Sequence, residues 1–169
     1  MKEVKNTTIY TNEIVKKFLE IYYFEKIKTL RIILNVLIII MIVSFFTNSE
    51  KTTLDIITLI LSLFGILEIN TTMIPRLNYY KLTKKKDSIL GSKVTYIFRK
   101  TNFNLNRKEN IEYITLNKVI ETEKNYYLYL NSSKSLIVDK TKLKEDEINF
   151  ITENLKEKVS TYKYKNNVW

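Results

Sequence analysis

The chain has 169 residues and a formal net charge of +10, from 28 Lys and Arg side chains against 18 Asp and Glu. It contains no Cys and no His, which excludes disulfides, thiolate metal sites and histidine as a general base or metal ligand. Its two glycines are too few for a glycine-rich phosphate-binding loop, so nucleotide-binding fingerprints of that kind are excluded as well.

Residues 1–29 form the first predicted segment, which is amphipathic and suited to a membrane interface. The stretch 4–10 alternates, and its pattern fits either a short strand or a disordered tail. From Asn12 the apolar residues recur three or four positions apart, which predicts a helix. The end of this helix is rich in Tyr and Lys, residues whose apolar bodies can be buried while their polar ends stay in water.

Two apolar runs follow and predict a transmembrane hairpin over residues 30–74. The first run ends at Phe46, and the second extends from Leu54 to Ile74. A transmembrane helix needs ~20 residues, with a usual range of ~17–25, and the first run reaches the lower end of that range only if Leu30 and Arg31 are included. Both runs are apolar on all sides and are joined by a short polar link. This favours two spans over the alternative, a buried helical hairpin in a soluble protein.

The basic residues that flank the apolar runs predict the orientation of the hairpin. The loop between the runs has a single basic residue, Lys51, which lies next to Glu50. The flanking residues are Lys16, Lys17, Lys26, Lys28 and Arg31 before the first run, and Arg76, Lys81, Lys84, Lys85 and Lys86 after the second. Cytoplasmic flanks carry such an excess, so both termini are predicted to be cytoplasmic. The abundance of Ile, Asn, Lys and Tyr is typical of an AT-rich bacterial genome. Together with the two predicted spans, this composition predicts a multi-pass protein of the bacterial cell membrane.

Polar residues inside the apolar runs suggest an intramembrane contact. Asn35 and Glu68 lie at similar depth on the two predicted antiparallel helices, and Arg31 is about one helical turn away. A carboxylate in hydrocarbon is costly and is usually paired. We therefore predict that Glu68 bonds to Asn35 or Arg31. The alternative is that Glu68 extends to water at the interface.

A basic juxtamembrane linker is predicted over residues 75–88. Residues 75–100 carry eight basic side chains and one acidic side chain, so most of the net charge lies just after the second apolar run. This placement argues against nucleic acid as a partner, which would require a basic face on the folded domain. It instead favours contact with anionic lipids through Arg76, Lys81, Lys84, Lys85 and Lys86. The alternative is that these residues only determine topology.

Residues 89–165 are predicted to form a small cytoplasmic domain, because the apolar pattern changes from helical spacing to alternation. The predicted strands are Lys93–Arg99, Phe103–Arg107, Ile111–Leu116, Lys118–Glu123, Tyr126–Asn131 and Ser135–Asp139. Of these, Lys118–Glu123 and Tyr126–Asn131 are predicted to form a β-hairpin. A helix with the apolar stripe Ile148, Ile151, Leu155 and Val159 follows them. The expected fold class is α+β: a transmembrane hairpin, then a small antiparallel sheet or partly open barrel capped by a C-terminal helix.

This arrangement resembles the YcxB-like family, in which a two-helix anchor precedes a pleckstrin-homology-like domain. The resemblance rests on GSKVTYIF at 91–98, IEYITLNKVIETEKNYYLYL at 111–130 and SLIVDKTKLKEDEINFITENLKEK at 135–158. Two departures are Tyr113, where we expect Trp, and Asp139, where we expect Pro. The resemblance implies no catalytic residues and no cofactor.

The resulting functional prediction is a membrane-anchored binding module that contacts an anionic lipid surface or a membrane-associated protein. The alternative is a protein-interaction role, such as immunity to a membrane-acting toxin or regulation of an envelope complex. Tyr127 and Tyr129 would then form a contact surface, unless they serve in cross-strand packing. An enzyme is not expected. The carboxylates that could act in one are Glu112, Glu121, Glu123 and Asp139, and no spacing joins them in a cleft.

Overall fold

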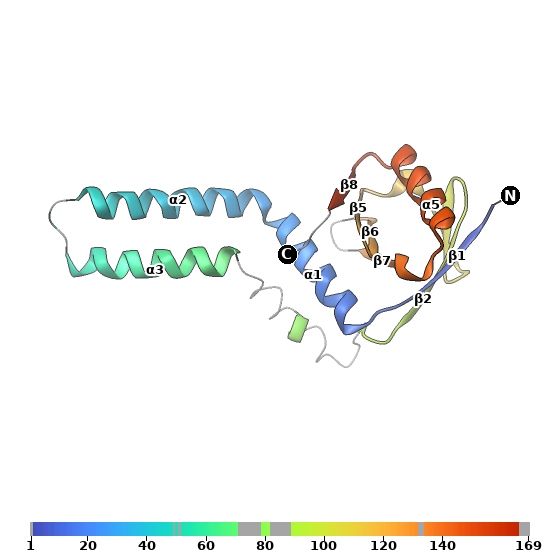
Figure 1. Cartoon of the computed structure of the whole chain (residues 1–169), viewed down its shortest axis with the longest axis horizontal. Helices are drawn as coiled ribbons and strands as arrows, with labels where there is room; N and C mark the ends of the chain where they lie inside the picture. Colours follow the sequence, from blue (N-terminus) through green and yellow to red (C-terminus); the bar gives the residue numbers. More distant parts are fainter. Residues whose placement is uncertain are drawn as a thin grey trace. The chain divides into compact units, whose positions relative to one another are not determined.

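A computed structural model describes residues 2–48, 50, 52–70, 79–81, 89–131 and 134–165 (Figure 1). The chain divides into two compact units. One unit contains Met1–Phe18 together with Asp87–Trp169, and the other contains Leu19–Lys86. The first unit is an α+β domain and the second is helical, which confirms the predicted α+β class.

The first sheet of the domain contains one strand from before the helical unit in the sequence and three strands from after it. Its four antiparallel strands follow chain order: β1 (Val4–Ile9), β2 (Lys93–Phe98), β3 (Asn102–Leu105) and β4 (Glu109–Glu112). β1 pairs with β2 along its whole length, from Val4 opposite Phe98 to Ile9 opposite Lys93. Of the two alternatives for residues 4–10, the strand is therefore correct. The domain begins before the helical unit, whereas the sequence predicted its start at residue 89.

The second sheet is built around the predicted hairpin. Its strands are β5 (Lys118–Thr122), β6 (Asn125–Tyr129), β7 (Ser135–Asp139) and β8 (Tyr162–Lys165), in the order β7-β6-β5-β8. The antiparallel pairing of β5 with β6 confirms the hairpin expected between 118 and 131. β8 runs parallel to β5 and was not predicted. A short 3-10 helix, Tyr113–Thr115, connects the two sheets.

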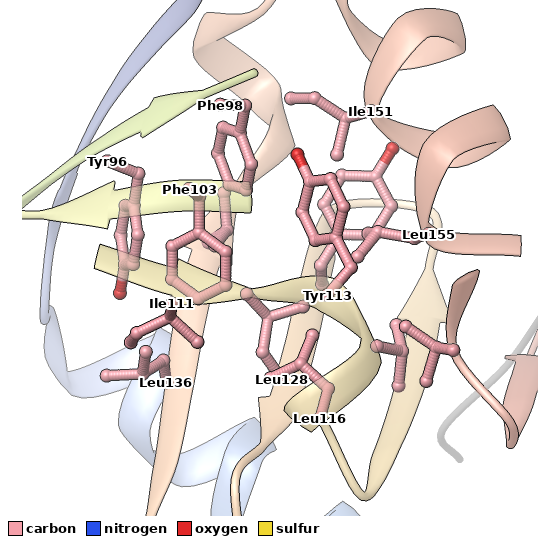
Figure 2. Close-up of a cluster of buried hydrophobic side chains, with 14 of the residues drawn as sticks. Tyr96, Phe98, Phe103, Ile111, Tyr113, Leu116, Leu128, Leu136, Ile151 and Leu155 are labelled. Atoms are coloured by element: carbon pink, nitrogen blue, oxygen red, sulfur yellow. The ribbon is translucent and has the colours of Figure 1, made fainter. Parts of the chain in front are cut away.

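Helix α5 (Glu145–Lys158) covers the aromatic core of the domain. Ile151 and Leu155 are fully buried, and Val159 follows them into the same core, so the predicted stripe is confirmed for these three residues. Figure 2 shows Ile151 and Leu155 facing a cluster of rings from the first sheet. Tyr113, in the position where Trp was expected, is also fully buried and donates a 2.8 Å hydrogen bond to the carbonyl of Arg99.

Side chains, rather than strand pairing, connect the two sheets where β1 meets β7. The amide of Asn6 donates to the carbonyl oxygen of Asp139 at 2.7 Å, and the Asp139 N–H donates to the hydroxyl of Thr8 at 2.9 Å. The hydroxyls of Tyr10 and Tyr96 bind the N–H and the carbonyl oxygen of Ile137 at 3.2 and 2.9 Å. We call these four side chains the β1–β7 bridge. The bridge provides hydrogen-bond partners for backbone N–H and carbonyl groups at the edge of β7, in place of a neighbouring strand. The described strands therefore form two sheets and not a closed barrel.

The helical unit is dominated by two apolar helices, α2 (Lys28–Thr47) and α3 (Thr53–Asn70), which lie side by side (Figure 1). Helix α1 (Asn12–Lys26) precedes them. A Cβ atom added to Gly65 would lie 3.4 Å from Cδ1 of Ile38, so this glycine is at the close contact between α2 and α3. No residue of α2 is buried. Among the described residues, α2 alone meets both the length and the composition that crossing a membrane requires.

Candidate functional site: a basic groove on the first sheet

A cavity of about 210 Å³ lies on the solvent-facing side of the first sheet, and we call it the basic groove. Its lining residues are Lys5 and Thr7 of β1, Lys93 and Thr95 of β2, and Asn106 and Arg107 of the turn between β3 and β4. The alternation of side chains along a strand explains why the four residues of β1 and β2 line the groove. Val4, Asn6 and Thr8 of β1 point inward and are buried, so Lys5 and Thr7 point outward. Pairing of β1 with β2 then places Thr7 opposite Thr95.

The turn between β3 and β4 closes one end of the groove. The N–H of Asn106 donates to the carbonyl oxygen of Thr95 at 2.8 Å, and the N–H of Thr95 donates to Oδ1 of Asn106 at 2.9 Å. These bonds fix the turn beside β2. Asn106 and Arg107 have φ angles of 52° and 60°, in the left-handed region. Asn tolerates that region because its side chain bonds locally, but for Arg it costs roughly 1–2 kcal/mol relative to Gly.

The cations of the groove have no acidic partner, unlike several others in the domain. Within the described residues, Lys5, Lys93 and Arg107 form no salt bridge, and no carboxylate lines the groove. Other cations are paired: Arg99 with Glu3 at 2.7 Å, Lys134 with Glu109 at 3.3 Å and Lys140 with Glu121 at 2.5 Å. The hydroxyls of Thr7 and Thr95 lie 3.5 Å apart between the groove cations. Positive charges beside hydroxyl donors are the chemistry that binds an oxyanion.

A buried ionic cluster in the second sheet has a structural role. The ammonium group of Lys140 binds the carboxylate of Glu121 and the carbonyl oxygen of Thr122, the latter at 3.0 Å, and lies 4.9 Å from the centroid of the Tyr126 ring. The hydroxyl of Tyr162 donates to the same carboxylate, which attaches β8 to β5. Burial raises the pKa of Tyr162, and the adjacent Glu121 charge raises it further. Glu121 is therefore a buried residue whose charge is held by Lys140.

The other predicted carboxylates do not join Glu121. Asp139, in the position where Pro was expected, accepts hydrogen bonds from the N–H and hydroxyl of Thr141 at 2.9 and 2.6 Å and thereby caps a short 3-10 helix. Its other oxygen lies 3.9 Å from the ammonium group of Lys142. Glu112 and Glu123 do not share the burial of Glu121 and Asp139. Glu121 and Asp139 therefore each have a cation of their own, Lys140 and Lys142.

The predicted lipid-contact residues lie mostly outside the described part of the chain. Lys81 is described and exposed. The other four, Arg76, Lys84, Lys85 and Lys86, lie outside the described residues. Their contact with anionic lipids stays a prediction.

The predicted intramembrane residues Arg31, Asn35 and Glu68 are all half-buried. The guanidinium of Arg31 lies 4.9 Å from the centroid of the Phe24 ring. The pKa of Tyr23 is raised, mainly by burial. The charge of Arg31 lowers this pKa and the charge of Glu68 raises it, so both charges act on the same phenol. The pairing of Glu68 with Asn35 or Arg31 stays a prediction.

Tyr127 and Tyr129 do not form an exposed contact surface, and of the two interpretations of these residues packing is the correct one. Their exposed fractions are 0% and 7%. The ring of Phe18, from helix α1, stacks on Tyr127 with centroids 5.9 Å apart and lies 6.4 Å from Tyr129. The outward face of β6 is thus covered, and both rings serve in packing, which was the alternative reading.

Sequence reasoning missed the basic groove because its residues come from distant parts of the chain. The pairs Lys5–Thr7 and Lys93–Thr95 each show the period-two spacing of an outward strand face. That signal is local. The groove exists only because β1 pairs with β2 across the intervening helices, and the alternation in 4–10 did not by itself identify its partner.

Residues 106–155 match the family model of YcxB-like proteins. The match begins in the turn that closes the basic groove and continues through β4, the second sheet's first three strands and most of α5. No curated protein and no solved structure matches the chain. The match confirms, over these residues, the resemblance to the YcxB-like family that the sequence predicted.

Proposed function

We propose that this chain is a two-span protein of the bacterial cell membrane whose folded domain is a cytoplasmic binding module for the anionic membrane surface. The observation that carries the proposal is topological. The apolar helices are inserted between β1 and β2, and these two strands pair with each other along their whole length.

This insertion limits the number of membrane crossings. Because β1 and β2 belong to one sheet, the chain before the helices and the chain after them lie on the same side of any membrane. If α2 crosses, the chain must therefore return. The apolar helix α3 is available for the return, and its 18 residues extend about 27 Å at ~1.5 Å per residue, close to the ~30 Å of a bilayer core. Its acidic residues, Asp55 and Glu68, lie near its two ends.

The exposed side chains of α2 and α3 support lipid as their surroundings. Most of the described Leu, Ile, Val and Phe residues along both helices are about half exposed or more, from 48% at Ile57 to 73% at Leu54. A continuous apolar surface of this kind is rare on a soluble monomer and marks a membrane or protein contact. The hydrocarbon of a bilayer would cover this apolar surface along the whole length of both helices.

Positive charge supports an anionic lipid surface as the ligand. Lys and Arg near such a surface contribute roughly 1 kcal/mol each. Lys81 and the cations of the basic groove have this chemistry. The alternative, a protein-interaction role such as toxin immunity, is weakened because its predicted contact residues Tyr127 and Tyr129 are buried.

Cysteine labelling tests the topology directly, because the native chain has no cysteine. Asn48→Cys places a thiol just after α2, and Asn110→Cys places one on β4 of the domain; both positions are exposed. We expect a membrane-impermeant maleimide to label Asn48→Cys in intact cells and Asn110→Cys only after lysis. Labelling of Asn110→Cys in intact cells, or failure to label Asn48→Cys until lysis, would overturn the proposal.

A further inference from the structure

We infer that the basic groove is a discrete site for a phosphate monoester, presented by the headgroup of a phosphatidic-acid-type lipid. This inference deepens the proposed function, on which the lipid source of the phosphate rests. General attraction to an anionic surface needs only charge. A discrete site needs donors arranged around one group, and the groove has such an arrangement.

Three positive charges converge on the groove. Lys5, Lys93 and Arg107 come from β1, from β2 and from the β3–β4 turn, and they line a single hollow without a carboxylate. None of the three is neutralised by a salt bridge within the described residues. A phosphate monoester carries about −1.5 to −2 charges near pH 7, more than the single charge of a phosphodiester. Three cations in one hollow therefore favour the monoester.

Hydrogen-bond donors lie among these cations. The hydroxyls of Thr7 and Thr95 lie on adjacent strands, 3.5 Å apart, within the lining of the same groove. The guanidinium of Arg107 can bind two phosphate oxygens at once, which an ammonium group cannot do in a fixed plane. A tetrahedral oxyanion has several oxygens to accept these donors, whereas a planar carboxylate has two.

Arg107 is an unusual residue for its place in the turn between β3 and β4. The turn is closed by the bond from the N–H of Lys108 to the carbonyl oxygen of Leu105 at 3.0 Å, and a tight hairpin turn of this kind requires a positive φ at both central residues. Gly and Asn adopt that conformation at the lowest cost, and Asn106 also bonds to the N–H of Thr95. The turn explains the φ of 60° at Arg107, but no ion pair within the described residues explains why the residue is an arginine. A role for the guanidinium in ligand binding accounts for its presence.

The size of the groove limits the ligand. Its volume of about 210 Å³ is below the ~300–1,000 Å³ typical of sites for drug-sized molecules. The groove suits a single small polar group, such as a headgroup that consists of one phosphate, better than a nucleotide.

The test is a calorimetric titration of the full chain in micelles of a neutral maltoside detergent. The titrants are mixed micelles of the same detergent with dioctanoyl phosphatidic acid, dioctanoyl phosphatidylserine or dioctanoyl phosphatidylcholine, and inorganic phosphate alone. We expect saturable binding of phosphatidic acid at least ten-fold tighter than of phosphatidylserine, weak binding of inorganic phosphate, and none of phosphatidylcholine.

Three variants assign the binding to the groove. Arg107→Gly removes the guanidinium and also relieves the left-handed backbone, so lost binding cannot come from unfolding. We expect it to weaken phosphatidic acid binding roughly ten- to hundred-fold, as expected for lost hydrogen bonds to a charged group. Lys93→Gln is expected to act in the same direction. Lys108→Gln, an equal loss of charge at the neighbouring exposed position outside the groove, is the matched control and is expected to change affinity less than two-fold.

The outcomes separate the alternatives. Equal binding of phosphatidic acid and phosphatidylserine, or equal losses in Arg107→Gly and Lys108→Gln, would mean general charge attraction and overturn the inference. Inorganic phosphate binding as tightly as phosphatidic acid would overturn the lipid source. The titration in detergent does not depend on orientation in a membrane. Failure there with correct cysteine labelling refutes the site alone, whereas binding with reversed labelling refutes the cytoplasmic location alone.

Discussion

The domain and the apolar helices use the same residue types with opposite results. In the domain, Val119, Ile120 and Leu128 have no exposed surface. In the helices, Leu37 and Ile40 are 50% and 57% exposed. Apolar content does not make a core unless layers of structure enclose it, and the domain has two sheets and a helix to do so. The domain therefore shields its apolar side chains from water with its own sheets and helix, whereas the helices depend on their surroundings for that shielding.

Polar groups show the same contrast. The carboxylate of Glu121 is buried in the domain and is held by Lys140 and Tyr162. Glu68 in α3 is half-buried near the end of its helix. A buried charge whose partner is removed is severely destabilising, whereas a charge near an interface can reach water. The effects of substitutions on stability are therefore expected to be larger in the domain than in the helices.

The largest expected effect is the loss of the buried carboxylate in the domain. Glu121→Leu leaves the ammonium group of Lys140 buried, with a side chain only 8% exposed and no counter-charge, and is expected to lower the free energy of unfolding by about 3–5 kcal/mol. The measurement is urea unfolding of the full chain in neutral detergent, followed by the near-ultraviolet circular dichroism of the tyrosines. The double variant Glu121→Leu/Lys140→Met removes both charges and is expected to recover most of the loss. A double variant as unstable as the single one would contradict the ion-pair explanation.

The second effect compares the same truncation in the two regions. Leu128→Ala empties a fully buried site facing α5 and the first sheet, and is expected to lower the domain's free energy of unfolding by about 2–5 kcal/mol. Leu37→Ala, at a half-exposed position of α2, leaves no enclosed cavity and is expected to leave that transition unchanged. The same urea titration measures both variants. Equal losses would show that the helices belong to the domain's cooperative core.

The third effect concerns the β1–β7 bridge, by which the domain uses residues from before the helices. Asn6→Ala leaves the buried carbonyl of Asp139 without its 2.7 Å donor and is expected to cost about 1–3 kcal/mol. Asn110→Ala, at an exposed position of β4, is the matched control and is expected to stay within about 0.5 kcal/mol. A negligible effect of Asn6→Ala would mean that the bridge contributes little to joining the sheets.

Sequence reasoning predicted the parts of the domain whose contacts are local. The β5–β6 hairpin has its two alternating runs and its turn within a few residues, and the stripe of α5 repeats at helical spacing. The pairing of β1 with β2 is not local, because the apolar helices separate the strands. β8 was missed because its short YKYK sequence has no buried apolar residue and its parallel partner β5 lies far back in the chain.

The buried tyrosines show why alternation alone misplaced part of the surface. Alternation assumes one wet face per strand, and every residue of β6 is buried. One face of β6 turns to the core and the other is covered by Phe18 of α1. The candidate site was unpredictable for a related reason. Charge counts located the excess after the second apolar run, whereas the basic groove depends on which strands pair and on the conformation of Arg107.

The smallest expected effect is in the apolar helices, where the predicted contact of Glu68 with Asn35 or Arg31 is tested. Polar contacts between membrane helices contribute on average ~0.6 kcal/mol, so Glu68→Gln is expected to destabilise the α2–α3 pair by about that amount. The measurement is loss of helicity on titration with dodecyl sulfate. A double-mutant cycle with Arg31→Gln, and a second with Asn35→Ala, isolates the pairwise coupling. Coupling in one cycle identifies the partner of Glu68. If both cycles are additive, neither Arg31 nor Asn35 stabilises the helix pair through Glu68. The two regions then differ in kind, because the domain depends on its ion pair for stability and the pairing of the helices does not depend on these two contacts.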